Sequence, residues 1–234
     1  LPPRTASGDS VFLYFAGHGS RQPQPGQSWT KADGLDEIFL PRDVGRWSEG
    51  QQQVAGAIVG SEIGRVVDAL RARGVFVWLV FDSCHSATGA RAIVNAQIRS
   101  RGVPPGKLGA PERTAAATDG TPPLQLVRVS DRHLAGGYVA FYAAQGAQTA
   151  PELPLPAGAS DRQVHGLFTY SLLKGLAQAH AASYREIALR ILADYTITYP
   201  DTTPEFEGAL DEPVQAGATA ATQDSWPVTR DADG

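Results

Sequence analysis

One histidine and the only cysteine of the chain are the residues best suited to covalent chemistry. His18 lies between two glycines, and Cys84 lies two positions after Asp82, at the end of an apolar run. A thiolate attacks carbonyl carbons, and a neighbouring imidazole can take the thiol proton or stabilise the thiolate. If the two side chains lie close together, they can act as the nucleophile and base of an acyl-transfer enzyme.

Both residues come directly after a predicted β-strand. Residues 11–15 are aromatic and β-branched and stop at the glycines around His18, whereas residues 75–82 have the continuous apolar character of a central strand. Between them, residues 61–73 carry apolar side chains at helical spacing and end at Gly74. Strand, helix and strand at this spacing predict a right-handed βαβ unit. Both strand ends then lie at one edge of a parallel sheet, where open α/β sheets bind their ligands.

Two backbone groups at this edge could stabilise the oxyanion formed when a carbonyl is attacked. Gly19 has no side chain, so its N–H can approach a developing negative charge, and the N–H of Cys84 can be the second donor. Taken alone, a buried cysteine is most often a small hydrophobe and a histidine beside glycine a turn residue. Their joint position at two strand ends favours the catalytic interpretation.

The rest of the chain supplies further elements and a tail. We expect a strand over 138–144, helices over 166–179 and from a capping box at Ser183 and Glu186, and an edge strand near 203–208. Residues 99–123 are rich in Pro and Gly and predict an exposed, mobile loop. Residues 215–234 are rich in Ala, Thr and Asp and predict a tail or linker, which leaves one domain at 1–214.

The two strand ends are similar in sequence to those of a known family. They read VFLYFAGHG (11–19) and VFVWLVFDSCHSATG (75–89), and they resemble the histidine and cysteine boxes of the caspase-like cysteine peptidases (clan CD, peptidase C14), closest to bacterial metacaspases, or orthocaspases. Residues 33–43, 165–176 and 203–208 agree more weakly, in the same order. The resemblance covers about residues 9–214.

The resemblance implies a fold and an activity. The fold is α/β, the caspase-like (caspase-hemoglobinase) three-layer sandwich around a mostly parallel central sheet. The activity is that of a cysteine endopeptidase with a dyad, in which Cys84 is the nucleophile and His18 is the base and then the acid that protonates the leaving amine.

The family also prefers Arg or Lys before the cleaved bond, and Asp82 matches an acidic residue of that pocket. Because side chains alternate along a strand, positions 82 and 84 face the same side, where a carboxylate can bind a guanidinium. The alternative for Asp82 is a strand-end residue that accepts hydrogen bonds from nearby backbone N–H groups.

The chain departs from the family pattern in two places. Ala16 stands where members often carry serine, two positions before the histidine. The family fold begins with a strand and helix ahead of the histidine strand, and we expect these to be missing here, since the chain starts at Leu1 and contains no Met. Accessory segments are therefore expected outside this chain.

Basic residues of the predicted loop are candidate sites of self-processing, because relatives can cleave themselves in this region. The candidates are Arg99, Arg101, Lys107 and Arg113. Calcium activates some family members, although no regular calcium-loop spacing is present and no cofactor is required. The acids that could hold calcium are Asp33, Asp36, Glu37 and Asp43.

Composition argues against several other classes of function. The chain has 20 Lys and Arg against 24 Asp and Glu, a net charge of −4, which gives no support to a nucleic-acid or anionic-membrane binder. The longest apolar run, residues 75–81, is far shorter than the ~20 residues that span a bilayer, and no signal segment is visible, so we expect a soluble chain. A single cysteine excludes an internal disulfide and a multi-thiolate zinc site, and no metal site is predicted.

Three functions remain open. The first is the endopeptidase acting on polypeptides. The second is a catalytically silent caspase-like scaffold or regulatory domain. The third is another thiol-dependent hydrolase on an α/β sheet.

Overall fold

The computed structural model describes residues 5–24, 34–84, 99–111, 129, 133–145, 148–178 and 182–214. Within these residues the central sheet has the strand order β1-β7-β9-β12. Its strands are β1 (Ser10–Ala16), β7 (Phe76–Asp82), β9 (Tyr138–Tyr142) and β12 (Glu205–Gly208). The first three are parallel and β12 runs antiparallel to β9, so the predicted mostly parallel sheet is confirmed.

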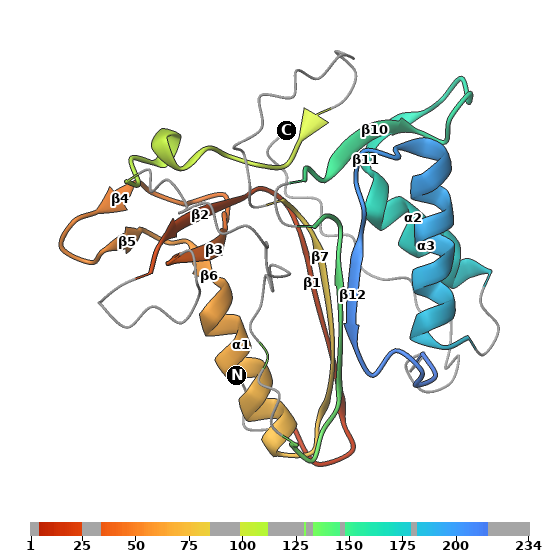
Figure 1. The fold of residues 1–234 in the computed structure, drawn as a ribbon, viewed down its shortest axis with the longest axis horizontal. Helices are drawn as coiled ribbons and strands as arrows, with labels where there is room; N and C mark the ends of the chain where they lie inside the picture. Colours follow the sequence, from red (N-terminus) through yellow and green to blue (C-terminus); the bar gives the residue numbers. More distant parts are fainter. Residues whose placement is uncertain are drawn as a thin grey trace, which may run out of the picture.

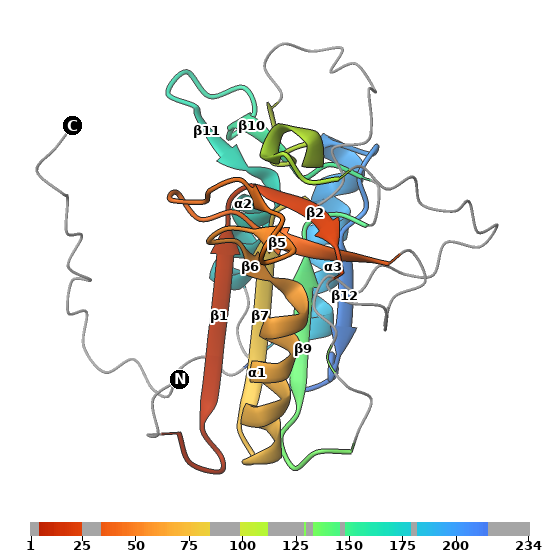
Figure 2. The same ribbon diagram turned by 90° about the vertical axis from the view of Figure 1, so that its left-hand side faces the viewer.

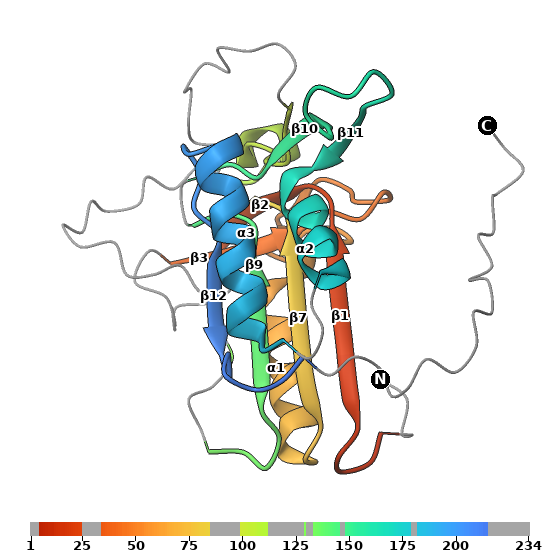
Figure 3. The same ribbon diagram turned by 90° about the vertical axis from the view of Figure 1, so that its right-hand side faces the viewer.

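Helices cover both faces of this sheet, which makes a three-layer sandwich (Figure 1). Helix α1 (Gly60–Ala72) lies on one face (Figure 2), and α2 (Leu167–Ala177) and α3 (Tyr184–Thr198) lie on the other (Figure 3). The predicted caspase-like α/β architecture is therefore confirmed. None of the helices among the described residues combines the length and apolar character that crossing a bilayer requires.

The predicted βαβ unit consists of β1, α1 and β7. Helix α1 places Ile63, Val67 and Leu70 against the sheet, in a core that also contains Leu79 and Phe81 of β7. It ends before Gly74, whose φ of +79° suits glycine. Strand β7 is buried from Val77 to Asp82 because α1 covers one face and the α2–α3 layer the other.

The helix α3 begins where the sequence predicts it. The Ser183 hydroxyl accepts a hydrogen bond from the N–H of Glu186, and the Glu186 carboxylate accepts one from the N–H of Ser183 at 2.8 Å. This capping box satisfies two otherwise unpaired donors of the first turn. Ile187 and Ile191 then pack with Phe168 of α2 in the second core.

Smaller sheets lie at the carboxyl ends of the central strands (Figure 1). One contains β2 (Gly19–Pro23), β3 (Leu35–Phe39) and β6 (Ile58–Val59), and beside it β4 (Trp47–Ser48) pairs with β5 (Gln53–Val54). A third contains β8 (Arg99–Ser100), β10 (Pro151–Leu155) and β11 (Gln163–Gly166), and the 3₁₀ turn η1 (Pro105–Leu108) follows β8.

The prediction of an exposed loop from residue 99 is wrong in part for residues 99–111, because they contain β8 and η1 and are only partly exposed. Strand β8 pairs antiparallel with β10, and Leu108 and Ala110 are buried beside Ile38 and Val54. The prolines and glycines shape tight turns on the surface of a core instead of preventing structure; Gly109, for example, has a φ of +75°. Residues 112–123 and the predicted tail at 215–234 lie outside the described residues.

Candidate active site

Strands β1 and β7 end at the same level, which brings His18 and Cys84 to one edge of the sheet. The two strands pair in register up to Ala16 and Asp82, and the N–H of Gly17 donates to the carbonyl of Asp82 at 3.2 Å. His18 and Cys84 each lie two residues beyond that last pair. Both residues therefore follow the same edge of the sheet, while their roles as a dyad stay a prediction.

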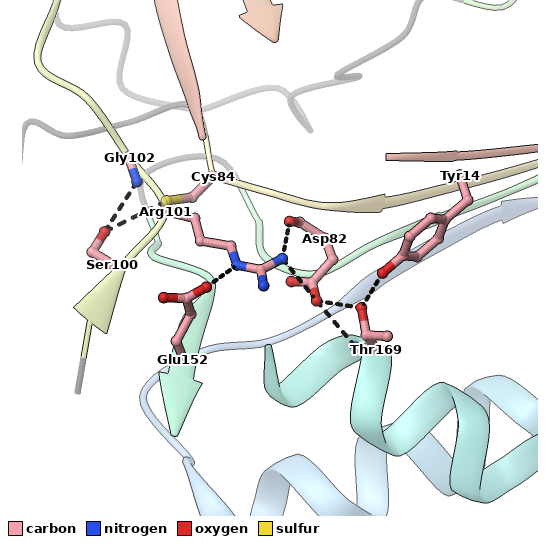
Figure 4. Close-up of polar contacts among 8 residues, drawn as sticks. All are labelled: Tyr14, Asp82, Cys84, Ser100, Arg101, Gly102, Glu152 and Thr169. Carbon is pink, nitrogen blue, oxygen red and sulfur yellow. Dashed lines mark hydrogen bonds and ion pairs between the residues drawn. The ribbon is translucent and has the colours of Figure 1, made fainter. Parts of the chain in front are cut away.

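The Cys84 thiol has a different partner from the predicted one. The cysteine is 2% exposed, and its sulfur lies 3.6 Å from the hydroxyl of Ser100 (Figure 4). His18 is exposed to solvent, and within the described residues no hydrogen bond joins it to the thiol.

Burial raises the pKa of the Cys84 thiol, and hydrogen bonds from Ser100 and from the backbone of Ala150 and Arg101 oppose that shift only in part. The neutral thiol is therefore favoured at neutral pH. Attack by this sulfur would require the imidazole of His18 to approach it.

Asp82 is completely buried and binds a guanidinium. Nη1 of Arg101 lies 3.1 Å from Oδ2 of Asp82 and donates to the carbonyl oxygen of the same residue at 2.7 Å (Figure 4). The hydroxyl of Thr169 also donates to Oδ2, as does the Thr169 N–H at 3.2 Å. The alternative interpretation of Asp82, a carboxylate held by backbone N–H groups, thus holds only for the contact with Thr169.

Burial raises the pKa of the Asp82 carboxyl, and the charge of Arg101 and the hydrogen bonds from Thr169 oppose this shift. The other oxygen, Oδ1, is buried and has no hydrogen-bond partner among the described residues. The site therefore favours a cation bound to the carboxylate, and Oδ1 can still accept a hydrogen bond.

Four further residues surround the pair of Asp82 and Arg101, and sequence reasoning did not find them. Glu152 of β10 accepts a hydrogen bond from Nε of Arg101 at 2.9 Å, and the Tyr14 hydroxyl lies 2.7 Å from that of Thr169. A cavity of about 510 Å³ opens beside Arg101 and is also lined by Gly166. These residues come from β1, β10, β11 and α2, far apart in the chain, so no local motif could have signalled them.

Gly166 lies so close to Asp82 that only glycine fits. A Cβ atom there would clash with Oδ2 of Asp82 and would lie 2.8 Å from Nη2 of Arg101. We expect Gly166→Ala to lower the free energy of unfolding by roughly 1–3 kcal/mol because the buried ion pair must shift. We also expect this variant to hydrolyse Arg-containing peptides more slowly than the wild type.

Chemical denaturation and a peptide assay would measure both effects. Gly175→Ala on α2 is the matched control, because the nearest atom to its new Cβ would be 3.7 Å away. Equal stability and activity in the two variants would contradict this account of the pocket.

The N–H of Gly19, a predicted oxyanion donor, is already hydrogen-bonded to a peptide carbonyl of the chain. It donates to the carbonyl oxygen of Arg101 at 2.9 Å, and the carbonyl of Gly19 accepts from the N–H of Val103 at 2.9 Å. This N–H is therefore occupied in this conformation, and its role as an oxyanion donor stays a prediction. The second predicted donor, the N–H of Cys84, stays a prediction.

The other candidate residues are dispersed. Lys107 is exposed in η1, and Arg113 lies outside the described residues, as does Asp33. Asp36 accepts hydrogen bonds from Gln24 at 3.1 Å and Ser61 at 3.4 Å. Glu37 is buried, with an oxygen 3.8 Å from Nε of Arg21, and Asp43 is exposed. Calcium binding by these acids stays a prediction.

Comparison with known proteins supports the resemblance that the histidine and cysteine motifs indicate. Residues 2–92, which contain both His18 and Cys84, match the family model of the metacaspase, peptidase C14 domain. Metacaspase-1B of Aspergillus fumigatus is 38% identical over 80 residues, which are 34% of this chain and 17% of that protein. Metacaspase-1 of Emericella nidulans is 35% identical over 80 residues, again 34% of this chain and 17% of the relative.

The resemblance to the caspase-like cysteine peptidases, and to metacaspases in particular, is thereby confirmed. The matched relatives named here are fungal, and the bacterial type stays a prediction. The chain spans about a sixth of the length of these relatives, so their activity as whole proteins does not pass to it directly.

The fold has a solved counterpart. A protein of Geobacter sulfurreducens with a crystal structure superposes with a TM-score of 0.53 at 23% identity. The match covers 89% of this chain and 72% of that one. It supports the architecture described above and says nothing of activity.

Proposed function

We propose that this chain is the catalytic part of a cysteine endopeptidase that cleaves peptide bonds after Arg or Lys. The observation that carries the proposal is the in-register pairing of β1 with β7, which ends at Ala16 and Asp82, two residues before His18 and two residues before Cys84. The match to the metacaspase domain supports it, because the matched residues include both motifs.

The proposed reaction is acyl transfer to the thiol. His18 takes the proton of Cys84, the sulfur adds to the substrate carbonyl, and the N–H groups of Gly19 and Cys84 stabilise the oxyanion. His18 then protonates the leaving amine, and water hydrolyses the thioester. No step needs a metal or cofactor.

The contact between Asp82 and Arg101 supports the preference for basic residues. The guanidinium of Arg101 binds two carboxylates there. The side chain of Asp82 is fully buried, and that of Glu152 is 26% exposed. A buried carboxylate discriminates strongly for a cationic side chain because a neutral one would leave its charge unpaired.

One observation favours a second candidate, the catalytically silent scaffold. The thiol contacts Ser100, and the pocket at Asp82 is filled by Arg101, so the described conformation has no room for a substrate's basic side chain at that carboxylate. An enzyme with this structure must displace Arg101 before it binds a substrate in the same place.

A panel of fluorogenic peptides ending in Arg, Lys or Asp tests the proposal. We expect turnover of the Arg and Lys peptides by the wild type, none by Cys84→Ala, and little turnover of the Asp peptide. Parallel reactions with calcium and with a chelator decide whether calcium activates. A preference for Asp would contradict the pocket assignment, and a folded protein that turns over no peptide would favour the scaffold.

A further inference from the structure

Helix α2 begins without a cap from its own segment. Its first helical residue is Leu167, and the residue before it, Gly166, makes no side-chain capping hydrogen bond. The first turn of α2 contains no acidic residue either. Because the first N–H groups of a helix have no partner within the helix and carry partial positive charge, this end needs both an acceptor and a negative charge from elsewhere.

Asp82 of β7 supplies both. Its Oδ2 accepts a hydrogen bond from the N–H of Thr169, the third residue of α2, at 3.2 Å, and a second from the Thr169 hydroxyl (Figure 4). The approach depends on the missing side chain at Gly166, where a Cβ atom would clash with Oδ2. The carboxylate of the proposed specificity pocket is therefore tied to the start of a helix 87 residues away in the chain.

The hydroxyl of Thr169 is itself held by Tyr14 of β1. The two hydroxyl oxygens lie 2.7 Å apart, and Figure 4 shows Thr169 between Tyr14 and Asp82. A hydroxyl has one proton, and that of Thr169 is directed at the carboxylate, so Tyr14 is the donor in the second contact. A chain of donors of this kind strengthens its last bond, here the one to Asp82.

The carboxylate depends on these bonds once its cation leaves. Arg101 is the cation on Asp82 in this conformation, with Nη1 3.1 Å from Oδ2, and the proposed function requires a substrate's basic side chain to replace it. During the exchange the buried carboxylate has no cation, and burial then favours its neutral, protonated form. The bonds from Thr169 remain, because neither comes from the segment that carries Arg101.

We propose that Thr169, supported by Tyr14, is a positioning residue of the pocket at Asp82, and that its hydrogen bonds set how strongly the site selects a cationic side chain over a neutral one. The inference rests on the proposed function and identifies residues that determine the specificity of that site. Thr169 acts through Asp82, since its bonds are to Oδ2 and leave Oδ1, which has no hydrogen-bond partner among the described residues, to accept from an incoming guanidinium.

A purely structural role for Thr169 has different consequences. If its bonds only fasten α2 to β7, their loss should lower stability and affect all peptides alike. If they keep the carboxylate charged and oriented, their loss should weaken the binding of an Arg peptide and spare a neutral one.

Steady-state kinetics of Thr169→Val separates the two roles. Valine has nearly the shape of threonine and keeps the backbone N–H, so only the hydroxyl bond is lost. The substrate ends in Arg, and the same peptide ending in citrulline, the neutral isostere of Arg, is measured by its inhibition constant. We expect KM for the Arg peptide to rise about ten- to a hundredfold with kcat little changed, and the inhibition constant of the citrulline peptide to change less than about twofold.

Three further variants locate the effect. Thr169→Ser keeps the hydroxyl and should restore the wild-type KM. Thr196→Val on α3 is the matched control, because Thr196 is exposed and its hydroxyl donates to the carbonyl of Leu192 in its own helix. Tyr14→Phe should raise KM by less than Thr169→Val does. Added to Thr169→Val it should have no further effect, because Tyr14 acts through Thr169.

The pH profile gives a second measurement. The charged or titratable groups that face the Asp82 carboxyl from the surrounding elements are Arg101, Glu152, Cys84, Tyr14 and Tyr195. None of them is changed in Thr169→Val, whereas the lost hydrogen bond is one that lowers the pKa of Asp82 against the effect of burial. The acid limb of kcat/KM for the Arg peptide should therefore move to higher pH in Thr169→Val and stay in place in Thr169→Ser.

Thermal melting shows which variants are folded. If Thr169→Val does not fold, Tyr14→Phe carries the test with the same two peptides, since Tyr14 is 42% exposed and its hydroxyl is the outer end of the chain of bonds. A folded variant that keeps the wild-type KM and acid limb, or that weakens both peptides equally, overturns the inference. The proposed function then stands, provided the wild type hydrolyses the Arg peptide. A folded wild type that hydrolyses no Arg peptide refutes the proposed function and the inference with it.

Discussion

Cys84→Ala is expected to reduce the hydrolysis of an Arg peptide on the order of 10⁶-fold in kcat. The loss is that large because alanine offers no atom that can bond to the substrate carbonyl. His18→Ala should lose less, about 10²–10⁴-fold, since a thiol retains some nucleophilicity without a base.

The double variant tests whether the two residues act together. Residues that form one catalytic unit have strongly non-additive effects, so Cys84→Ala combined with His18→Ala should be no slower than Cys84→Ala alone. This matters because the structure aligns the two residues through the register of β1 and β7 and shows no hydrogen bond between them among the described residues.

Steady-state kinetics with an active-site titration would measure these rates. His133→Ala is the control, since His133 is exposed and takes no part in the site. If His18→Ala retained wild-type kcat and KM, the dyad would be wrong, even though the two residues leave neighbouring strands.

The second large effect is expected on stability. Asp82→Ala should lower the free energy of unfolding by about 3 kcal/mol, near the lower end of what breaking a buried ion pair costs. The side chain of Asp82 is fully buried and that of Arg101 is 12% exposed, so the guanidinium would lose its most buried partner. Glu152 remains 2.9 Å from Nε, which limits the loss.

Urea denaturation of four proteins measures the interaction itself. The wild type, Asp82→Ala, Arg101→Gln and the double variant form a cycle, and we expect the double variant to be more stable than the sum of the single losses predicts. Fully additive losses would show that the two charges do not interact across the pocket.

The contribution of Asp82 to the free energy of unfolding should change with pH in a defined direction. Because burial holds the pKa of Asp82 above its ordinary value, the folded protein binds this proton more tightly than the unfolded chain. The wild type should therefore gain stability relative to Asp82→Asn as the pH falls through the raised pKa. A difference that stays constant with pH would contradict the raised pKa.

Local patterns were sufficient to predict the elements that carry the candidate site. The apolar run before Asp82 predicts a central strand, the helical spacing after residue 60 predicts the crossover, and the glycines around His18 predict where β1 stops. The capping box at Ser183 predicts the start of α3 to the residue. In each case the determining contacts are within one element or between the two strands of one βαβ unit.

Local patterns failed where burial depends on distant partners. Pro and Gly after residue 99 predict an exposed loop, yet Leu108 and Ala110 pack under β3 and β5 and Arg101 enters the acidic pocket. Composition describes how easily a backbone turns. It does not tell which surface the turned backbone will pack against.

By itself, the amino-acid sequence determined the α/β class, the strand ends that carry His18 and Cys84, and the likeness to caspase-like peptidases. Only the tertiary structure decided the contacts of the functional groups: Ser100 on the thiol, Arg101 and Thr169 on Asp82, and a peptide carbonyl on Gly19. The reason is that hydrogen-bond partners such as Asp82 and Thr169, 87 residues apart, meet through the packing of sheet and helix layers, which no short stretch of sequence encodes.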